Sequence, residues 1–327
     1  MTSIVGHQAA QAAFTAALRG GALHHAWLLA GPEGVGKAAF ARAAALRMLA
    51  EASGGPALAP GLDIPDDHPT RSLMEAGSHP DFRVLARLAK TSDTGAESVA
   101  RSITIDQVRG LLPMFATTPS LGGRRVVVID AIDDLERGGA NALLKSLEEP
   151  PAGTVFLLVS HAPGRLLPTI RSRCRTLRFS ALDDADLRRI LRATLPDAGE
   201  DEIAAAARAG EGSPGRALRF AGLDIAALDA AVDRLLQTGD PNNAERVRLV
   251  HALSGKSAQA RYEAFLERAP AAIARVARDR TGPALRATLD AHGAARDLAG
   301  SALGLSLDPQ ATVFEMGTIL AGLASPA

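Results

Sequence analysis

One glycine-rich turn has the residue types and the spacing to hold a phosphate chain. It fits G-x-x-x-x-G-K, in which glycines let backbone N–H groups close on a polyphosphate and the lysine neutralises its charge. The apolar residues 27–30 precede the turn and an alanine-rich helical segment follows, so the N-terminus of that helix would point at the phosphates. The residues of this predicted nucleotide cradle are Gly31, Gly34, Val35, Gly36 and Lys37.

The position after the lysine departs from the motif. Active enzymes of this type carry Ser or Thr there, and the hydroxyl binds Mg²⁺. This sequence has Ala38 instead. The glycines and Lys37 could still hold ATP or ADP, but magnesium would be held weakly. The sequence therefore favours a fold that resembles an ATPase and has lost part of its metal chemistry.

An acidic candidate ends the apolar run at 125–130. The run is typical of a buried parallel strand, and its last residue is Asp130. In nucleotide-binding sheets such a carboxylate lies beside the phosphate loop and holds magnesium. The alternative, an aspartate that merely caps the strand, stays open from the residues alone.

These candidates need a parallel sheet to position them. Besides the strand before the turn, apolar runs predict strands at 81–85, 125–130, 154–160 and 177–179. Helical spacing, caps and breakers predict helices at 1–20, 38–50, 141–149, 183–193 and 201–209, and a further helix capped by Ser213. Residues 51–80 and 90–102 are predicted to be loops, and from residue 181 onward no strand is predicted.

Composition narrows the class of protein. The 327 residues balance 36 basic against 36 acidic side chains, which argues against a globally basic nucleic-acid binder. Cys174 is the single cysteine, so an internal disulfide and a cysteine-based zinc site are excluded. The apolar runs are too short to cross a bilayer, and the first residues lack the order of a signal peptide. We expect a cytoplasmic protein with no membrane partner.

Two further motifs make the pattern specific. Residues 141–151 read Asn-Ala-Leu-Leu-Lys-Ser-Leu-Glu-Glu-Pro-Pro, and residues 172–174 read Ser-Arg-Cys within a basic stretch. With the phosphate loop and the strand that ends in aspartate, they resemble the bacterial clamp-loader subunits of DNA polymerase III, in the AAA+ class. The resemblance implies an α/β AAA+ domain with a RecA-like parallel sheet and helices on both faces at 1–180, a helical lid domain at 181–221 and an all-helical oligomerisation collar at 222–327.

Within that family the sequence looks like the delta-prime subunit. Active motor subunits have Glu after the strand-terminal aspartate, where it polarises the attacking water, and this sequence has Ala131. Asp133 or Asp134 is a weak substitute for the missing base, because both lie past the strand end. Together with Ala38, the resemblance implies a non-hydrolysing subunit of the polymerase holoenzyme, with no ATPase activity of its own.

The resemblance also gives roles to two arginines. Arg173 would act in trans as an arginine finger, because a permanently charged planar guanidinium can stabilise the terminal phosphate of a nucleotide held by a neighbouring subunit. The alternative for Arg173 is a solvated basic loop. Arg216 corresponds to the lid arginine that reaches the subunit's own nucleotide in active relatives, and a purely structural role is equally plausible here. Cys174 is expected to be a small packed residue.

The partners and cofactors also follow from the resemblance. The implied partners are the motor (gamma/tau) and delta subunits, with the sliding clamp reached indirectly and primer-template DNA bound by the whole complex. Many relatives bind zinc through four cysteines after the first helix of the domain, whereas residues 51–80 contain none. His68 and His79 are interpreted as surface histidines. We expect no zinc and no required cofactor.

Two other classes of function remain as alternatives. An autonomous P-loop ATPase or nucleotide kinase that tolerates Ala38 would turn over ATP as an isolated chain. A protein that binds DNA by itself would bind duplexes in a salt-dependent manner. Asn141 and Lys145 lie on a predicted helix that could face DNA phosphates or cap neighbouring loops. The balanced net charge argues against independent DNA binding.

Overall fold

The chain forms two compact units in a computed structural model that describes residues 4–21, 23–55, 57–91 and 97–324. The N-terminal unit comprises residues 1–196 and 211–216, and the C-terminal unit comprises residues 197–210 and 217–327. Residues 211–216 thus belong to the N-terminal unit, although residues 197–210, which precede them in the sequence, belong to the C-terminal unit. The division into three domains at 180 and 221 stays a prediction.

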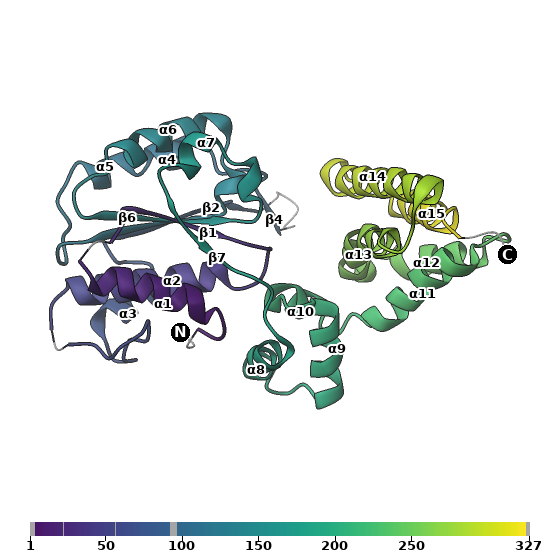
Figure 1. The fold of residues 1–327 in the computed structure, drawn as a ribbon, viewed down its shortest axis with the longest axis horizontal. Helices are drawn as coiled ribbons and strands as arrows, with labels where there is room; N and C mark the ends of the chain where they lie inside the picture. Colours follow the sequence, from purple (N-terminus) through teal and green to yellow (C-terminus); the bar gives the residue numbers. More distant parts are fainter. Residues whose placement is uncertain (1–3, 22, 56, 92–96, 325–327) are drawn as a thin grey trace. The chain divides into compact units, whose positions relative to one another are not determined.

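A five-stranded, all-parallel sheet is the centre of the N-terminal unit (Figure 1). Its strand order is β2-β5-β6-β1-β7, so the first strand lies between two strands from later in the sequence. The strands are β1 (Ala26–Ala30), β2 (Phe82–Ala86), β5 (Arg125–Asp130), β6 (Thr154–Ser160) and β7 (Arg175–Arg178). This arrangement confirms the predicted fold class, a parallel sheet with helices on both faces followed by a helical region.

Both faces of the sheet are covered because both sets of alternating strand residues are apolar. In β5, Val126 and Val128 pack on the side of α1 and α2, whereas Val127 and Ile129 pack on the side of α4 and α6. Figure 1 shows α1 and α2 below the sheet and α6 above it. The helices around the sheet are α1 (Gln8–Arg19), α2 (Lys37–Ala52), α3 (Pro69–Glu75), α4 (Ile105–Arg109), α5 (Leu112–Phe115), α6 (Arg137–Glu148), α7 (Pro168–Arg171) and α8 (Asp184–Thr194).

Several predicted boundaries were wrong. The last strand is Arg175–Arg178, not 177–179, and α6 begins at Arg137, not 141. The predicted loop at 51–80 contains α3, which begins with a proline in its first turn and is capped by the His68 side chain. The predicted loop at 90–102 contains an antiparallel pair, β3 (Ala89–Thr91) and β4 (Glu97–Val99), and its residues 92–96 lie outside the described ranges.

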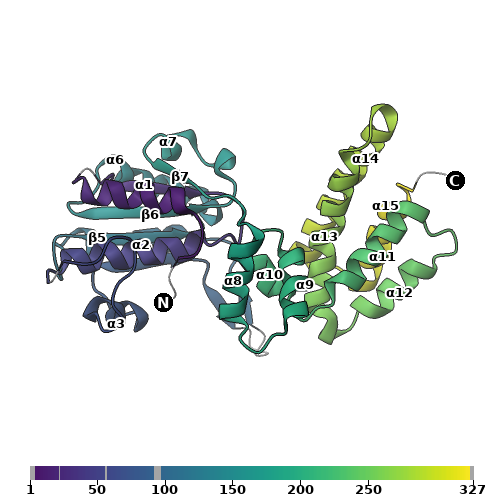
Figure 2. The same cartoon turned by 60° about the horizontal axis from the view of Figure 1, so that its bottom comes forward.

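The C-terminal unit is built from helices in its described part. Their apolar faces form one core cluster that includes Leu235, Phe265 and Met316. The guanidinium of Arg268 forms two short contacts with the Asp229 carboxylate, at 2.5 and 2.6 Å, and donates to the backbone of α9. The helices are α9 (Glu200–Gly210), α11 (Ile225–Thr238), α12 (Ala244–Leu253), α13 (Gln259–Ala277), α14 (Gly282–Leu305) and α15 (Pro309–Ala321), all visible in Figure 2. Helix α10 (Pro214–Phe220) crosses the boundary between the units.

None of the helices in the described ranges combines the length and apolar character needed to span a membrane.

The buried strand β6 gives a direct test of the packing. Phe156 is 0% exposed and its ring packs edge-on against Phe115. Phe156→Ala should lower the free energy of unfolding of the N-terminal unit by about 3–5 kcal/mol, because it leaves a cavity between the sheet and α5. Leu112→Ala, at a side chain 58% exposed, should stay within about 0.5 kcal/mol of the unmodified chain. Equal urea denaturation curves for the two variants would contradict this packing.

Candidate functional site

The phosphate loop joins the end of β1 to the start of α2. Its backbone is in the left-handed region at Gly34, with φ of 75°, and at Gly36, with φ of 106°. A Cβ atom at Gly34 would lie 2.4 Å from Ser213 Oγ, and one at Gly31 would lie 2.1 Å from the Phe179 carbonyl oxygen. The predicted glycines are therefore required by conformation and by close approach of other backbone segments.

Lys37 lies at the first position of α2 and is 2% exposed. Its ammonium donates to the carbonyl of Gly31 at 2.7 Å and to that of Pro32. Burial lowers the pKa of Lys37 to about 8, and the acidic residues Asp133, Glu33 and Asp130 partly oppose this shift. The ammonium of Lys37 thus contacts carbonyl groups of its own loop, and the three carboxylates are near enough to affect its pKa.

The N-terminus of α2 is aimed into the same loop. Gly36 is the N-cap and supplies no side-chain cap to the helix. Ala38 occupies the position where the motif calls for a hydroxyl, and its methyl group has neither donor nor acceptor. The loop thus ends at a helix N-terminus, the kind of backbone arrangement that can receive an anion, and the side chain that follows Lys37 has no metal-binding atom.

Asp130 ends β5 and lies two strands from the loop. Its register partner in β6 is Val159, and Ser160 at the end of β6 pairs with Ala30 at the end of β1. The following residue, Ala131, is buried. The structure therefore brings Asp130 to the predicted edge of the sheet, and the buried side chain that follows it is a methyl group.

The two neighbouring aspartates are engaged in structural contacts. One Asp133 oxygen accepts from the Ser160 hydroxyl at 3.0 Å, and the backbone N–H groups of His161 and Ala162 also donate to this carboxylate. Asp134 forms an ion pair with Arg87 at 3.0 Å. Because these groups hold loop ends together, the weak alternative that one of them replaces the missing base loses support.

Residues 211–216 lie directly on the phosphate loop. The hydroxyl of Ser213 donates to the Glu33 carbonyl at 3.0 Å, and the N–H of Gly215 donates to the Gly34 carbonyl at 2.9 Å. Ser213 also accepts from the N–H of Arg216 at 3.2 Å, as expected for the cap of α10. The side chain of Arg216 forms an ion pair with Glu211 at 3.0 Å.

A pocket of about 500 Å³ opens beside the loop. Its wall is mostly apolar and includes residues that sequence reasoning missed, from the first residues of the chain and from α8. The ring Nε2 of His7 lies 2.7 Å from the Val35 carbonyl oxygen and ties the chain's first segment to the loop. An apolar pocket next to a phosphate loop could take a flat base. The residues that line it are Ile4, Val5, His7, Val35, Gly36, Ala39, Arg189, Ile190, Ala193, Thr194 and Pro214.

Arg173 lies in a separate turn after α7. Its contacts come from α6 and from its own turn, whereas the phosphate loop contacts Ser160 at the end of β6 and residues 213–215. Its side chain is 34% exposed and pairs with Glu148 at 2.8 Å. Burial raises the pKa of Cys174 to about 12, in agreement with the predicted packed thiol.

The two histidines singled out in the 51–80 region, His68 and His79, have structural roles. The prediction of a surface position was wrong for His79, which is 1% exposed and whose Nδ1 accepts from the Asp81 N–H at 3.2 Å. Burial lowers the pKa of His79. His68 caps α3 by accepting from the Thr70 N–H. Among the residues that the structure describes, no three His, Cys, Asp or Glu side chains are grouped to hold a metal ion.

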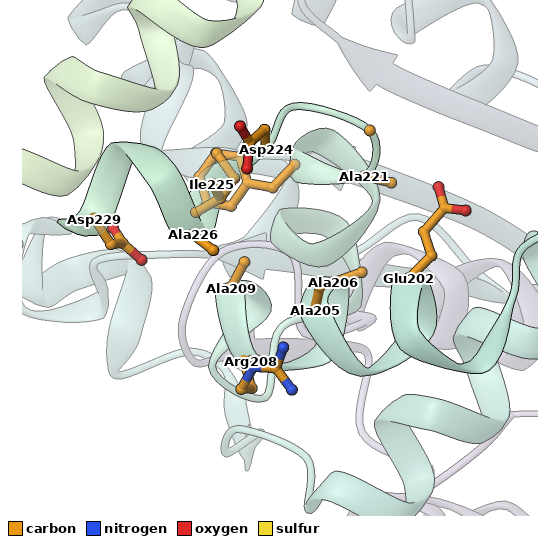
Figure 3. Close-up of a pocket in the computed structure, with 12 residues that line it drawn as sticks. Glu202, Ala205, Ala206, Arg208, Ala209, Ala221, Asp224, Ile225, Ala226 and Asp229 are labelled. Carbon is orange, nitrogen blue, oxygen red and sulfur yellow. The ribbon is translucent and has the colours of Figure 1, made fainter. Parts of the chain in front are cut away.

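A second cavity, of about 370 Å³, lies within the C-terminal unit between α9 and α11. Figure 3 shows that its wall is rich in alanine and that its charged side chains, Glu202, Arg208, Asp224 and Asp229, lie on different sides. Asp229 is already paired with Arg268. Polar groups that converge on one point are the usual sign of a ligand site, and this arrangement does not provide them.

The lowered pKa of Lys37 predicts a pH dependence. The unfolded chain has the ordinary value of 10.5, so between about pH 8 and 10.5 the unfolded state binds this proton and the folded state does not. Relative to a Lys37→Met control, the melting temperature of the unmodified chain should therefore rise as pH increases through this window. A difference between the two melting temperatures that is constant from pH 7 to 10.5 would contradict the shift.

Comparison with known proteins places the chain in a family. The profile of the family described as "DNA polymerase III, delta subunit" matches residues 6–183. The Pseudomonas aeruginosa protein named DNA polymerase III subunit delta' is 43% identical over 165 residues, which are 50% of this chain and 46% of that protein. The Escherichia coli delta' subunit is 38% identical over 146 residues, 45% of this chain and 41% of that protein.

Other similar proteins carry the names of tau and gamma subunits. The Escherichia coli tau subunit is 32% identical over 262 residues, 76% of this chain and 37% of that protein. A gamma subunit-related protein of Thermotoga maritima covers 91% of this chain and 94% of its own at 16% identity, with a TM-score of 0.42, too low to support an argument. The chain spans less than half the length of these curated relatives. Because the family profile covers more than half of the sequence, the chain belongs to the DNA polymerase III delta-prime family.

Proposed function

We propose that this chain is a non-hydrolysing subunit of the DNA polymerase III clamp loader that lends Arg173 to the nucleotide site of a neighbouring motor subunit. One observation carries the proposal: alanines stand at two positions where active relatives carry hydrolytic groups, Ala38 directly after Lys37 of the phosphate loop and Ala131 directly after Asp130 at the end of β5. Such a chain keeps the architecture of an ATPase and depends on another subunit for hydrolysis.

The missing groups explain why hydrolysis by this chain itself is not expected. Attack on the terminal phosphate needs a water molecule held by a carboxylate and a metal that neutralises developing charge. Ala131 offers no carboxylate, and Asp133 is held by the end of β6. Asp130 alone would leave a bound Mg²⁺ without its hydroxyl ligand from the loop. ATP or ADP would then be a structural ligand, held by the loop amides and by Lys37.

The arginine role rests on the chemistry of a guanidinium in an exposed turn. It keeps its charge at every physiological pH and presents donors in a plane that suits phosphate oxygens. The side chain of Arg173 is one-third exposed and its turn is anchored by the buried Ile170. It can therefore reach a second subunit without unfolding its own.

The proposed partners are motor subunits of the gamma/tau type, a delta subunit, the sliding clamp indirectly, and primer-template DNA as part of the complex. Similarity to the tau subunit over 76% of this chain supports the proposal that the two kinds of subunit share a fold and belong to the same clamp-loader complex. Exposed leucines on α14, Leu289, Leu303 and Leu305, support the collar as the assembly surface. As a replication subunit, the chain would act in the cytoplasm and carry neither zinc nor a required cofactor.

Replacing Arg173 tests the role in trans. In a complex reconstituted with motor and delta subunits, Arg173→Ala should lower hydrolysis at the facing nucleotide site about 10³-fold or more, because the terminal phosphate loses its external cation. The measurement is DNA-stimulated phosphate release, with assembly checked by complex mass. Arg171→Ala, at an exposed arginine of the same basic stretch, is the matched control and should leave the rate unchanged. An unchanged rate of phosphate release with Arg173→Ala would contradict the proposed role of Arg173 in trans.

The isolated chain separates this proposal from an autonomous ATPase. Purified protein with Mg²⁺ and ATP should release phosphate no faster than a Lys37→Ala variant, because both lack the hydroxyl and the carboxylate of an active site. Steady turnover by the unmodified chain that Lys37→Ala abolishes would instead establish the autonomous ATPase. Salt-sensitive duplex binding by the isolated chain would favour the DNA-binding alternative.

A further inference from the structure

An ion pair joins the helix segment that two prolines end to the Ser-Arg-Cys motif. Glu148 is the last residue of α6, in the segment that two prolines end, and Arg173 follows α7. Arg173 Nη2 lies 2.8 Å from Glu148 Oε1. The pair therefore links a carboxylate and an arginine that are 25 positions apart in the sequence.

The backbone on each side of the pair is fixed by the core. Leu147, next to Glu148, and Ile170, in the turn before Arg173, are both buried in the cluster on the α6 face of the sheet. Cys174 packs against the same cluster. Because both chain segments are anchored within a residue or a few residues of the charged groups, the separation of the two side chains is set by the fold.

The guanidinium has contacts at both of its terminal nitrogens. Besides the contact with Glu148, Arg173 Nη1 donates to the Thr169 carbonyl oxygen at 2.9 Å. A guanidinium has five N–H groups, so these contacts leave donors for a further anion. An arginine restrained in this way loses less rotamer freedom when it meets a phosphate than a free side chain would.

We infer that Glu148 is a positioning residue for Arg173, which it holds in the conformation that meets the phosphate of the neighbouring subunit. The inference rests on the proposed role of Arg173 and deepens it. Glu148 does not touch the nucleotide, and it acts through the orientation of the guanidinium. The neighbouring carboxylate, Glu149, is exposed and follows the helix end, which makes it the matched control.

The experiment uses the full chain in the reconstituted complex. Glu148→Ala should lower the kcat of DNA-stimulated ATP hydrolysis about threefold to tenfold, because a misplaced charge stabilises the transition state less well. The KM for ATP should not change, since the finger acts in the transition state. Glu149→Ala should leave both constants unchanged. Glu148→Asp, which keeps the charge, should restore part of the lost rate.

A double variant shows whether Glu148 acts through Arg173. If it does, Glu148→Ala should have no further effect in a chain that already carries Arg173→Ala. An equal loss in both backgrounds, or no loss in either, would overturn the positioning role. An effect of Arg173→Ala without any effect of Glu148→Ala would overturn this inference and leave the proposed function standing. No effect of Arg173→Ala would overturn both.

A measurement without activity tests the restraint itself. In the isolated chain, the side-chain ¹⁵N resonance of Arg173 should shift and its order parameter should fall in Glu148→Ala, but not in Glu149→Ala. The melting temperature should change by less than about 3 °C, because the pair is partly exposed. An unchanged Arg173 resonance in Glu148→Ala would overturn the restraint.

Discussion

The parallel register of β1, β5 and β6 is the constraint on which the rest of the N-terminal unit depends. Ala30 pairs with Ser160, and Asp130 pairs with Val159, so the three strands end together at one edge of the sheet. Parallel strands deliver their carboxyl ends to the same side, where open sheets bind ligands. The phosphate loop, Asp130 and the loop held by Asp133 meet there because of this register.

At this edge of the sheet the packing restricts the loop backbone directly. Side chains at Gly31 and Gly34 would clash with Phe179 and Ser213, so the shape of the loop is tied to the packing of the unit. Ala38 and the buried Ala131 contribute only methyl groups next to Lys37 and Asp130. Arg173 lies in a turn whose contacts come from Glu148 and Thr169.

Sequence reasoning identified the features that are encoded locally. The phosphate loop has a fixed spacing, and β5 and β6 are continuous apolar runs, so both could be found from neighbouring residues. Four features could not be found in this way: the burial of His79, the antiparallel pairing of β3 with β4, the Glu211 partner of Arg216 and the Glu148 partner of Arg173. Each depends on which segments pack together, and short elements such as α3 have too few residues to show a period.

The contact of residues 213–216 with the phosphate loop has a consequence for biosynthesis. The Ser213 hydroxyl reaches the Glu33 carbonyl across 180 positions of sequence. A chain that emerges from the ribosome N-terminus first can form the strands and helices of the sheet before this partner has been made. A nascent chain cut short before residue 213 therefore lacks the hydrogen bonds that Ser213 and Gly215 form with the loop, even when its sheet is assembled.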